Sequence, residues 1–237
     1  MYSFQSKIRY SESDSEGKLS LSSLLNYFQD CSTFQSEELG VGFRYLKERN
    51  LVWVLSSWQI VVERYPKLCE EVLIGTFPYE FKSFLGSRNF FMAGKNGEYL
   101  AKANSLWSLL STDTMKPVAT PEDIVNRYVL EPKLAMDYAS RKIVVPEGGS
   151  TADPILVQQY HLDTNHHVNN GQYVTIAMGY LPEGFGAAHG IRQMRAEYKM
   201  QAFLNDELYP YVVQSDDFVV VSLRNAEGKA YVNVEFR

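Results

Sequence analysis

The sequence predicts an α+β protein in which one arrangement, a strand, a long helix and a run of antiparallel strands, occurs twice. Two observations lead to this fold class. The hydrophobic pattern gives the same order of elements before and after residues 117–150. Short turns connect consecutive strands, which favours antiparallel pairing. Because 237 residues are enough for two small domains, we expect one unit at 1–116, a connection at 117–150 and a second unit at 151–237.

The first unit begins with residues 2–10, where apolar and polar side chains alternate as they do in a strand. Apolar residues then recur at helical spacing from Leu21 to Gln35, and Gly40 and Gly42 end this helix. Four further runs have the composition of strands, and the last two are joined by a glycine-containing turn at 94–97. These runs are 51–63, 72–78, 84–93 and 99–110.

The connection is marked by prolines at 117, 121, 132 and 146 around one short helix at 121–128. After it the order repeats, with a strand at 156–162, a helix at 168–180 and strands at 192–198, 207–213, 218–223 and 230–236. Two short sequences also recur. Residues 62–65 are echoed at 196–199, and the turn at 95–98 is echoed at 226–229. The repeat therefore extends from the element types to the residues.

Composition limits the class of protein. The chain is 45% hydrophobic and 22% charged, which is ordinary for a globular protein, and it has no apolar run long enough to span a membrane. Its net charge of −5 argues against general nucleic-acid binding. Cys31 and Cys69 are too few and too isolated for a disulfide framework or a zinc site. A cytoplasmic protein without a metal or cofactor is the expectation.

The polar stretch at 161–173 stands directly before the second predicted helix. Asp163, Asn165 and His167 alternate, so an extended backbone would point all three side chains to one side. Asn169 and Asn170 suit a helix start, where free backbone N–H groups favour negative charge and could hold a reacting carbonyl oxygen. A polar loop that caps an ordinary helix is the alternative interpretation.

The spelling Asp163-Thr-Asn165-His-His167-Val-Asn169-Asn170 resembles the active-site motif of the acyl-acyl-carrier-protein thioesterases of plants and bacteria. Segments 51–55, 59–66 and 103–107 resemble the same family, so the likeness covers most of the chain. It implies a double hotdog fold, with two antiparallel sheets that each wrap a central helix. It also implies hydrolysis of fatty acyl-acyl-carrier protein to a free fatty acid and holo-carrier protein.

The resemblance also divides the work between the units. Only the second unit has the Asp-Asn-His cluster, because the matching stretch at 11–18 carries no histidine. The chemistry is therefore expected in the second unit, and the acyl chain in the first. Four aromatic residues could line the acyl pocket, although most of them suit an ordinary core: Trp53, Trp58, Phe90 and Trp107.

Two assignments of the chemistry stay open. In one, Asp163 activates water or attacks directly, Asn165 orients it and His167 transfers the proton. In the other, His167 is the base and Asp163 orients it. Backbone N–H groups at the helix start would hold the oxyanion in both. The plant enzymes carry an acid and a cysteine where this chain has Gln201 and Ala202. Gln201 can still donate a hydrogen bond, but Ala202 cannot attack a thioester.

Three other functions fit parts of the pattern: an acyl-CoA thioesterase, a non-catalytic acyl-binding hotdog protein and a hotdog dehydratase. The dehydratase would need a histidine in one unit paired with an acid on a central helix, which the sequence does not present clearly. The expected partner is acyl-carrier protein. Because that protein and this chain are both acidic, docking would need local basic residues such as Arg192, Arg195 and Lys199 on one strand, with Lys82 and Arg88 in the first half. A homodimer is a further expectation.

Overall fold

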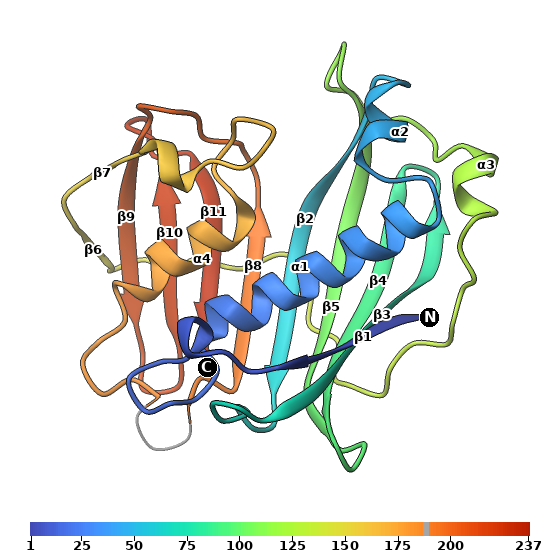
Figure 1. Cartoon of the computed structure of the whole chain (residues 1–237). Coiled ribbons are helices and arrows are strands. Elements are labelled where there is room, and N and C mark those ends of the chain that lie inside the picture. Colours follow the sequence, from blue (N-terminus) through green and yellow to red (C-terminus); the bar gives the residue numbers. More distant parts are fainter. Residues whose placement is uncertain (187–189) are drawn as a thin grey trace. The chain divides into compact units, whose positions relative to one another are not determined.

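The computed structural model describes residues 1–186 and 190–237, which form two compact units (Figure 1). The first consists of Met1–Ser56 and Ile60–Tyr138, and the second of Ser57–Gln59 and Ala139–Arg237. The stretch expected as a connection, 117–150, is thus divided between the units after Tyr138. No helix among the described residues is long and apolar enough to cross a membrane.

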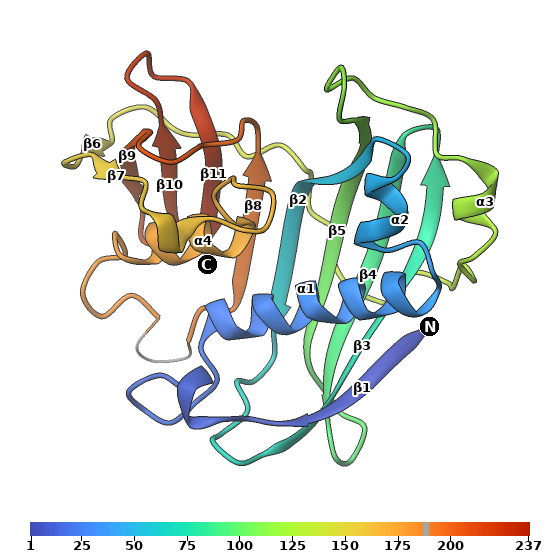
Figure 2. The same cartoon turned by 45° about the horizontal axis from the view of Figure 1, so that its top comes forward.

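The first unit is a sheet with one long helix, α1 (Leu21–Glu38), against one face (Figures 1 and 2). Its strand order is β1-β3-β4-β5-β2, and the pairs β1/β3, β3/β4 and β4/β5 are antiparallel. The strands are β1 (Tyr2–Lys7), β2 (Leu51–Val62), β3 (Glu71–Lys82), β4 (Leu85–Gly94) and β5 (Tyr99–Ser111). The short helices are η1 (Tyr10–Glu12), α2 (Phe43–Lys47) and α3 (Glu122–Val125).

Helix α1 forms where the apolar spacing predicts it. Ser20 caps its first turn, because its hydroxyl accepts a hydrogen bond from the Ser23 N–H. Leu25 and Phe28 are fully buried against the sheet, and Phe28 packs on Phe90 of β4 with 5.5 Å between ring centroids. The helix ends before Gly40, whose φ of +71° lies in the left-handed region that glycine adopts without strain.

The second unit repeats this plan with a shorter helix, α4 (Asn170–Met178), across one face of its sheet (Figure 2). The strand order is β8-β11-β10-β9-β6, with β7 also paired to β9. The strands are β6 (Ser150–Thr151), β7 (Ile155–Leu156), β8 (Gln193–Tyr198), β9 (Glu207–Gln214), β10 (Val219–Arg224) and β11 (Ala230–Phe236). The four long strands confirm the predicted ones within a few residues.

One predicted strand of this unit is mostly wrong. Residues 156–162 were expected to be extended, but only Ile155–Leu156 is strand, and Gln159–His161 forms a 3-10 turn, η2. The cause is local. The N–H of Gln158 donates to Nδ1 of His161 at 3.0 Å, which folds the chain back three residues later. The alternating pattern could not reveal this bond between a side chain and the backbone.

The two units have the same hydrogen bonds at the turn that leads into each helix. The Oδ1 atoms of Asp14 and Asp163 each accept hydrogen bonds from the backbone N–H groups two and four residues later. The N–H of each aspartate donates to the carbonyl oxygen of the fourth residue, at 2.7 Å and 2.8 Å. Ser20 and Asn169 then cap α1 and α4. Asp14 and Asp163 are therefore equivalent positions.

The two turns differ at one backbone contact. Leu19 donates to the carbonyl of Pro66 at 2.8 Å, and Val168 donates in the same way to Ala202 at 2.9 Å. Proline has no N–H, but Ala202 has one, and it donates to the hydroxyl oxygen of Tyr173 at 2.8 Å. Tyr173 is 2% exposed, and burial raises its pKa, so the hydroxyl stays neutral. The second unit therefore needs a tyrosine to accept the N–H of Ala202, whereas Pro66 in the first unit needs no acceptor.

We predict that Tyr173→Phe lowers the free energy of unfolding by about 1–3 kcal/mol, because the buried Ala202 N–H loses its acceptor. Urea denaturation measures the change. Tyr10→Phe removes a hydroxyl from a side chain that is 86% exposed, and it should change stability by less than about 0.5 kcal/mol. Equal stability of the Tyr173→Phe and Tyr10→Phe proteins would contradict the assigned contact.

Candidate functional site

The motif residues lie in the turn between η2 and α4, and this turn is not extended. The expectation that alternation places Asp163, Asn165 and His167 on one side of a strand is therefore wrong. The Asp163 carboxylate instead closes the turn, since its Oδ1 accepts from the N–H groups of Asn165 at 2.7 Å and His167 at 3.4 Å. Leu162 and Val168 form an antiparallel bridge at the base of the turn. Asp163 and His167 are thus brought together by the closed turn.

His167 is half-buried, with its ring edge-on to Phe203 at 5.0 Å between centroids. Burial lowers the pKa of its imidazole below the ordinary value of 6.5, because the charged form loses hydration. The Asp163 carboxylate opposes this shift and His166 adds to it. At neutral pH the ring is therefore neutral and can accept a proton.

Asn165 and His166 are exposed at the tip of the turn. The hydrogen bond from Asn165 to the Asp163 carboxylate comes from its backbone N–H, so the role of its side-chain amide stays a prediction. His166 adopts φ +62°, the left-handed conformation that closes the turn. His161 is 6% exposed and packs edge-on to Tyr160.

Gln201 is half-buried in the segment beside the motif. The hydrogen bond from Val168 to the carbonyl of Ala202 holds this segment against the end of the turn, and Phe203 reaches the ring of His167. The structure therefore holds the segment that carries Gln201 against the motif turn. Its function stays a prediction.

The first turn of α4 is held by Asn169, whose Oδ1 accepts from the N–H of Gly171 at 2.8 Å. This bond occupies one of the N–H groups expected to hold an oxyanion. The hydroxyl of Tyr198, on β8, donates to the carbonyl of Asn170 at 3.0 Å. Burial raises the pKa of Tyr198, so this donor stays protonated.

Sequence reasoning missed Tyr173 and Tyr198, which both support the site. Their rings pack edge to face, with 6.1 Å between centroids. A buried tyrosine hydroxyl needs a hydrogen-bond partner, and Tyr173 comes one helical turn after the capping residue Asn169. That spacing is the signal that could have identified Tyr173. Tyr198 could not be found this way, because its acceptor is distant in the sequence.

The expected basic docking group is only partly exposed. Arg195 pairs with Glu235 at 3.1 Å, and its side chain is only 13% exposed. It also donates to the carbonyls of Ser140 and Lys142. Arg195 is thus committed to holding the chain near β8, and its expected role in docking is wrong. Arg192 is exposed.

Arg88 was a second member of that expected basic group, and it is 8% exposed. A buried guanidinium cannot contribute to a docking surface, so its expected role is wrong for the same reason. Lys82 and Lys199 are exposed.

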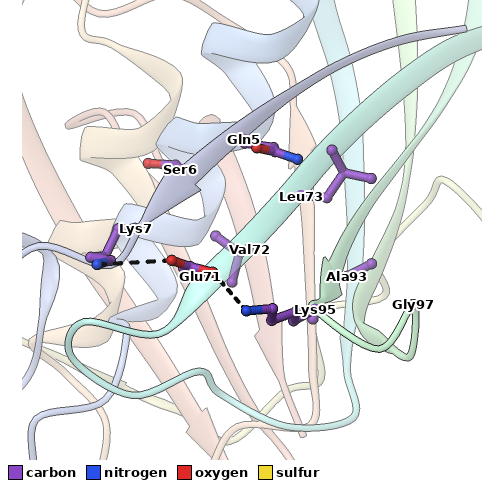
Figure 3. A pocket seen from close by; sticks show the side chains of 10 residues that line it. Gln5, Ser6, Lys7, Glu71, Val72, Leu73, Ala93, Lys95 and Gly97 are labelled. Atoms are coloured by element: carbon purple, nitrogen blue, oxygen red, sulfur yellow. Dashed lines mark ion pairs between the residues drawn. The ribbon is translucent and has the colours of Figure 1, made fainter.

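A surface groove in the first unit, beside β1, β3 and β4, is shown in Figure 3. Glu71 lies between Lys7 at 4.0 Å and Lys95 at 3.6 Å. No residue of the motif lines this groove, so it is separate from the candidate site. Among the residues that the structure describes, no group of three or more His, Cys, Asp or Glu side chains is placed to hold a metal ion.

Two family models match the chain. The acyl-ACP thioesterase N-terminal domain matches residues 1–128, and the acyl-ACP thioesterase C-terminal domain matches residues 146–234. The palmitoyl-acyl carrier protein thioesterase of Gossypium hirsutum is 26% identical over 91% of this chain and 55% of its own length. The dodecanoyl-[acyl-carrier-protein] hydrolase of Cinnamomum camphora is 27% identical over 85% of this chain and 56% of its own length. The chain spans about half the length of the curated relatives it matches.

Solved structures show the same fold. An acyl-ACP thioesterase from Bacteroides thetaiotaomicron superimposes with a TM-score of 0.90 at 22% identity, covering 99% of this chain and 96% of that one. The 12:0-ACP thioesterase from Umbellularia californica gives 0.88 at 19% identity, covering 100% and 96%. These likenesses confirm the predicted tandem hotdog fold.

The site makes a prediction for the titration of His167. Its pKa, followed by NMR of the imidazole protons, should lie below 6.5 and should fall further in Asp163→Asn, because the carboxylate that favours the imidazolium is lost. Asp14→Asn changes the equivalent turn of the first unit and should leave this titration unchanged. A His167 pKa that rises in Asp163→Asn would contradict the arrangement.

Proposed function

Because the chain belongs to the acyl-ACP thioesterase family, with both of its halves matched by that family's models, we propose that it hydrolyses fatty acyl-acyl-carrier protein. The products are a free fatty acid and holo-carrier protein. The observation that carries this proposal is the turn at 163–167, which holds a carboxylate and a neutral imidazole directly before the first turn of α4. Acyl-carrier protein is the proposed partner, whereas a cytoplasmic location and a homodimer stay predictions.

Hydrolysis begins when water attacks the thioester carbonyl. We assign the proton of that water to the neutral ring of His167, and the Asp163 carboxylate stabilises the imidazolium that forms. The lowered pKa of His167 supports this assignment, since a neutral ring is available at neutral pH. The tetrahedral intermediate then collapses, the carbon–sulfur bond breaks, and the imidazolium returns its proton to the departing thiolate. The carboxylic acid and the thiol balance the thioester and the water.

The negative oxygen of the intermediate needs hydrogen-bond donors. Because Asn169 accepts the N–H of Gly171, we assign the oxyanion to the N–H of Asn170, the first residue of α4. Tyr198 donates to the carbonyl of Asn170, which belongs to the following peptide group, and so restrains the backbone next to that N–H. Gln201 can donate a second hydrogen bond from its side-chain amide, but unlike a glutamate it cannot transfer a proton.

The first test is the loss of the two central groups. Asp163→Asn and His167→Ala should each lower kcat by about a hundredfold or more, the usual scale for removing an acid-base group. Steady-state hydrolysis of acyl-carrier protein thioesters measures the effect.

The repeat supplies matched controls for these variants. Asp14→Asn and Lys18→Ala change the equivalent positions of the first unit, and they should retain kcat within about twofold of the unmodified enzyme. If the first-unit variants lost as much activity as the second-unit ones, the effect would be one of folding. Near-normal turnover of His167→Ala would refute the assignment of the base.

The second test concerns Gln201. Gln201→Glu restores the acid that plant relatives carry, so kcat should stay the same or increase, and the pH profile should gain a limb at low pH from the new carboxyl. Rates measured across pH with one acyl substrate show this limb. In the unmodified protein, activity should fall as pH drops through the lowered pKa of His167, because the protonated ring cannot act as a base. Collapse of activity in Gln201→Glu would identify Gln201 as an obligatory neutral donor.

The third test separates the two thiol carriers. With the same acyl chain, kcat/KM should be higher for the thioester of acyl-carrier protein than for the thioester of CoA. The reverse order would establish the acyl-CoA thioesterase alternative, since both reactions share the same chemistry.

A further inference from the structure

Arg88, on β4 of the first unit, is a buried cation that the proposed chemistry does not use. The residue is 8% exposed and its guanidinium points to the face of the sheet that carries α1. Nη1 donates to the side-chain oxygen of Gln35 on α1 and, at 3.2 Å, to the hydroxyl of Thr76 on β3. Tyr128 lies with its ring 5.4 Å from the guanidinium carbon. Two polar side chains and one aromatic ring therefore surround the guanidinium of Arg88.

What Arg88 lacks is a counter-charge. Among residues 1–186 and 190–237, no carboxylate lies within ion-pair distance of its guanidinium, whereas the half-buried Arg195 of the second unit has Glu235. Burial lowers the pKa of Arg88, but an arginine side chain keeps its proton in proteins. The charge is held by neutral oxygen atoms and one aromatic ring. Such a group cannot be covered by hydrocarbon without a large loss of solvation.

The surroundings of Arg88 change character along α1. Toward its N-terminus, the buried face of the helix is apolar, with Leu24, Leu25 and Phe28 against the sheet. Toward its C-terminus, the same face carries the buried polar residues Ser32 and Gln35. Hydrocarbon that lies along this face is therefore favoured over the first turns and opposed where the helix reaches Arg88.

We propose that Arg88, held by Gln35 and Thr76, is the polar end wall of the acyl-chain site in the first unit and sets the longest saturated chain that the enzyme accepts. The inference rests on the proposed function and on the expectation, drawn from the family resemblance, that the first unit holds the acyl chain. Each methylene that reaches apolar surface adds to binding, but one that must displace a hydrogen bond of the guanidinium subtracts from it. Arg88 thus determines specificity without touching the reacting atoms.

The test replaces the wall with hydrocarbon of similar length. In Gln35→Leu/Arg88→Met both hydrogen-bonding partners become apolar, which proteins tolerate better than the loss of one partner. We expect this variant to accept saturated chains at least two carbons longer. The first chain beyond the wild-type limit should gain roughly tenfold in kcat/KM, the scale of methylene discrimination in a pocket. Short chains that do not reach Arg88 should be hydrolysed at the wild-type rate.

Two controls limit the interpretation. Arg88→Lys keeps a cation at the wall and should keep the wild-type limit. Tyr138→Phe removes a hydrogen bond to Asn89 at 3.0 Å, on the other face of β4, and should also leave the limit unchanged. Thermal unfolding of each variant shows whether it is folded. If the double variant does not fold, Cys31→Leu adds volume one turn before Gln35 and should move the limit toward shorter chains.

The outcomes separate the wall from the proposed function. An unchanged chain-length limit in a folded double variant, or in Cys31→Leu, overturns the proposal that Arg88 is the end wall. Faster hydrolysis of a chain ending in a carboxylate than of the saturated chain of equal length also overturns it, because Arg88 would then bind the chain end. If the wild-type protein hydrolyses no thioester of acyl-carrier protein at all, the proposed function fails. Calorimetric binding of free saturated fatty acids of increasing length then tests the wall on the same variants.

Discussion

The geometry of the site depends on one interaction, the acceptance of two backbone N–H groups by the carboxylate of Asp163. These bonds hold the carboxylate close to the backbone of His167, because the N–H groups of Asn165 and His167 both donate to one of its oxygen atoms. They also set the direction in which the chain enters α4, where Asn169 takes over as cap. The side chain that we propose assists the chemistry therefore also shapes the turn.

The first unit has the same turn without the residues proposed to be catalytic. Asp14 makes the same two hydrogen bonds, but the positions equivalent to Asn165 and His167 are Glu16 and Lys18, which pair with each other at 2.7 Å. A lysine stays charged at neutral pH and cannot act as a base there. The backbone has thus been kept while the side chains have diverged. This separation leaves the first unit free to use its helix face for another purpose.

Much of the fold could be predicted from the sequence, because the long strands and α1 follow regular hydrophobic patterns. The strand predicted at 156–162 could not, since the Nδ1 of His161 redirects the backbone there. The shape of the candidate site could not be predicted either. Alternation suggested three side chains on one face of a strand, whereas the Asp163 carboxylate bends the chain into a turn. Bonds between side chains and a nearby backbone leave no periodic signal.

Long-range contacts were the other gap. Nothing in the sequence around Arg88 or Arg195 distinguishes them, yet one is buried among neutral oxygen atoms and the other is paired with Glu235. Their different surroundings arise from residues that are distant along the chain. The sequence therefore shows which residues are basic, but it does not show which of them are exposed.

The hydroxyl of Tyr173 ties the segment that carries Gln201 to helix α4. The amide hydrogen of Ala202 is bonded to a buried side chain of α4, whereas the carbonyl of Ala202 is bonded to Val168 at the end of the motif turn. Ala202 is fully buried, so solvent reaches that amide when the segment separates from Tyr173. Its hydrogen-exchange rate therefore reports how readily this segment separates from α4, independent of catalysis. A tighter site, for example with a product bound, would slow exchange at this single position.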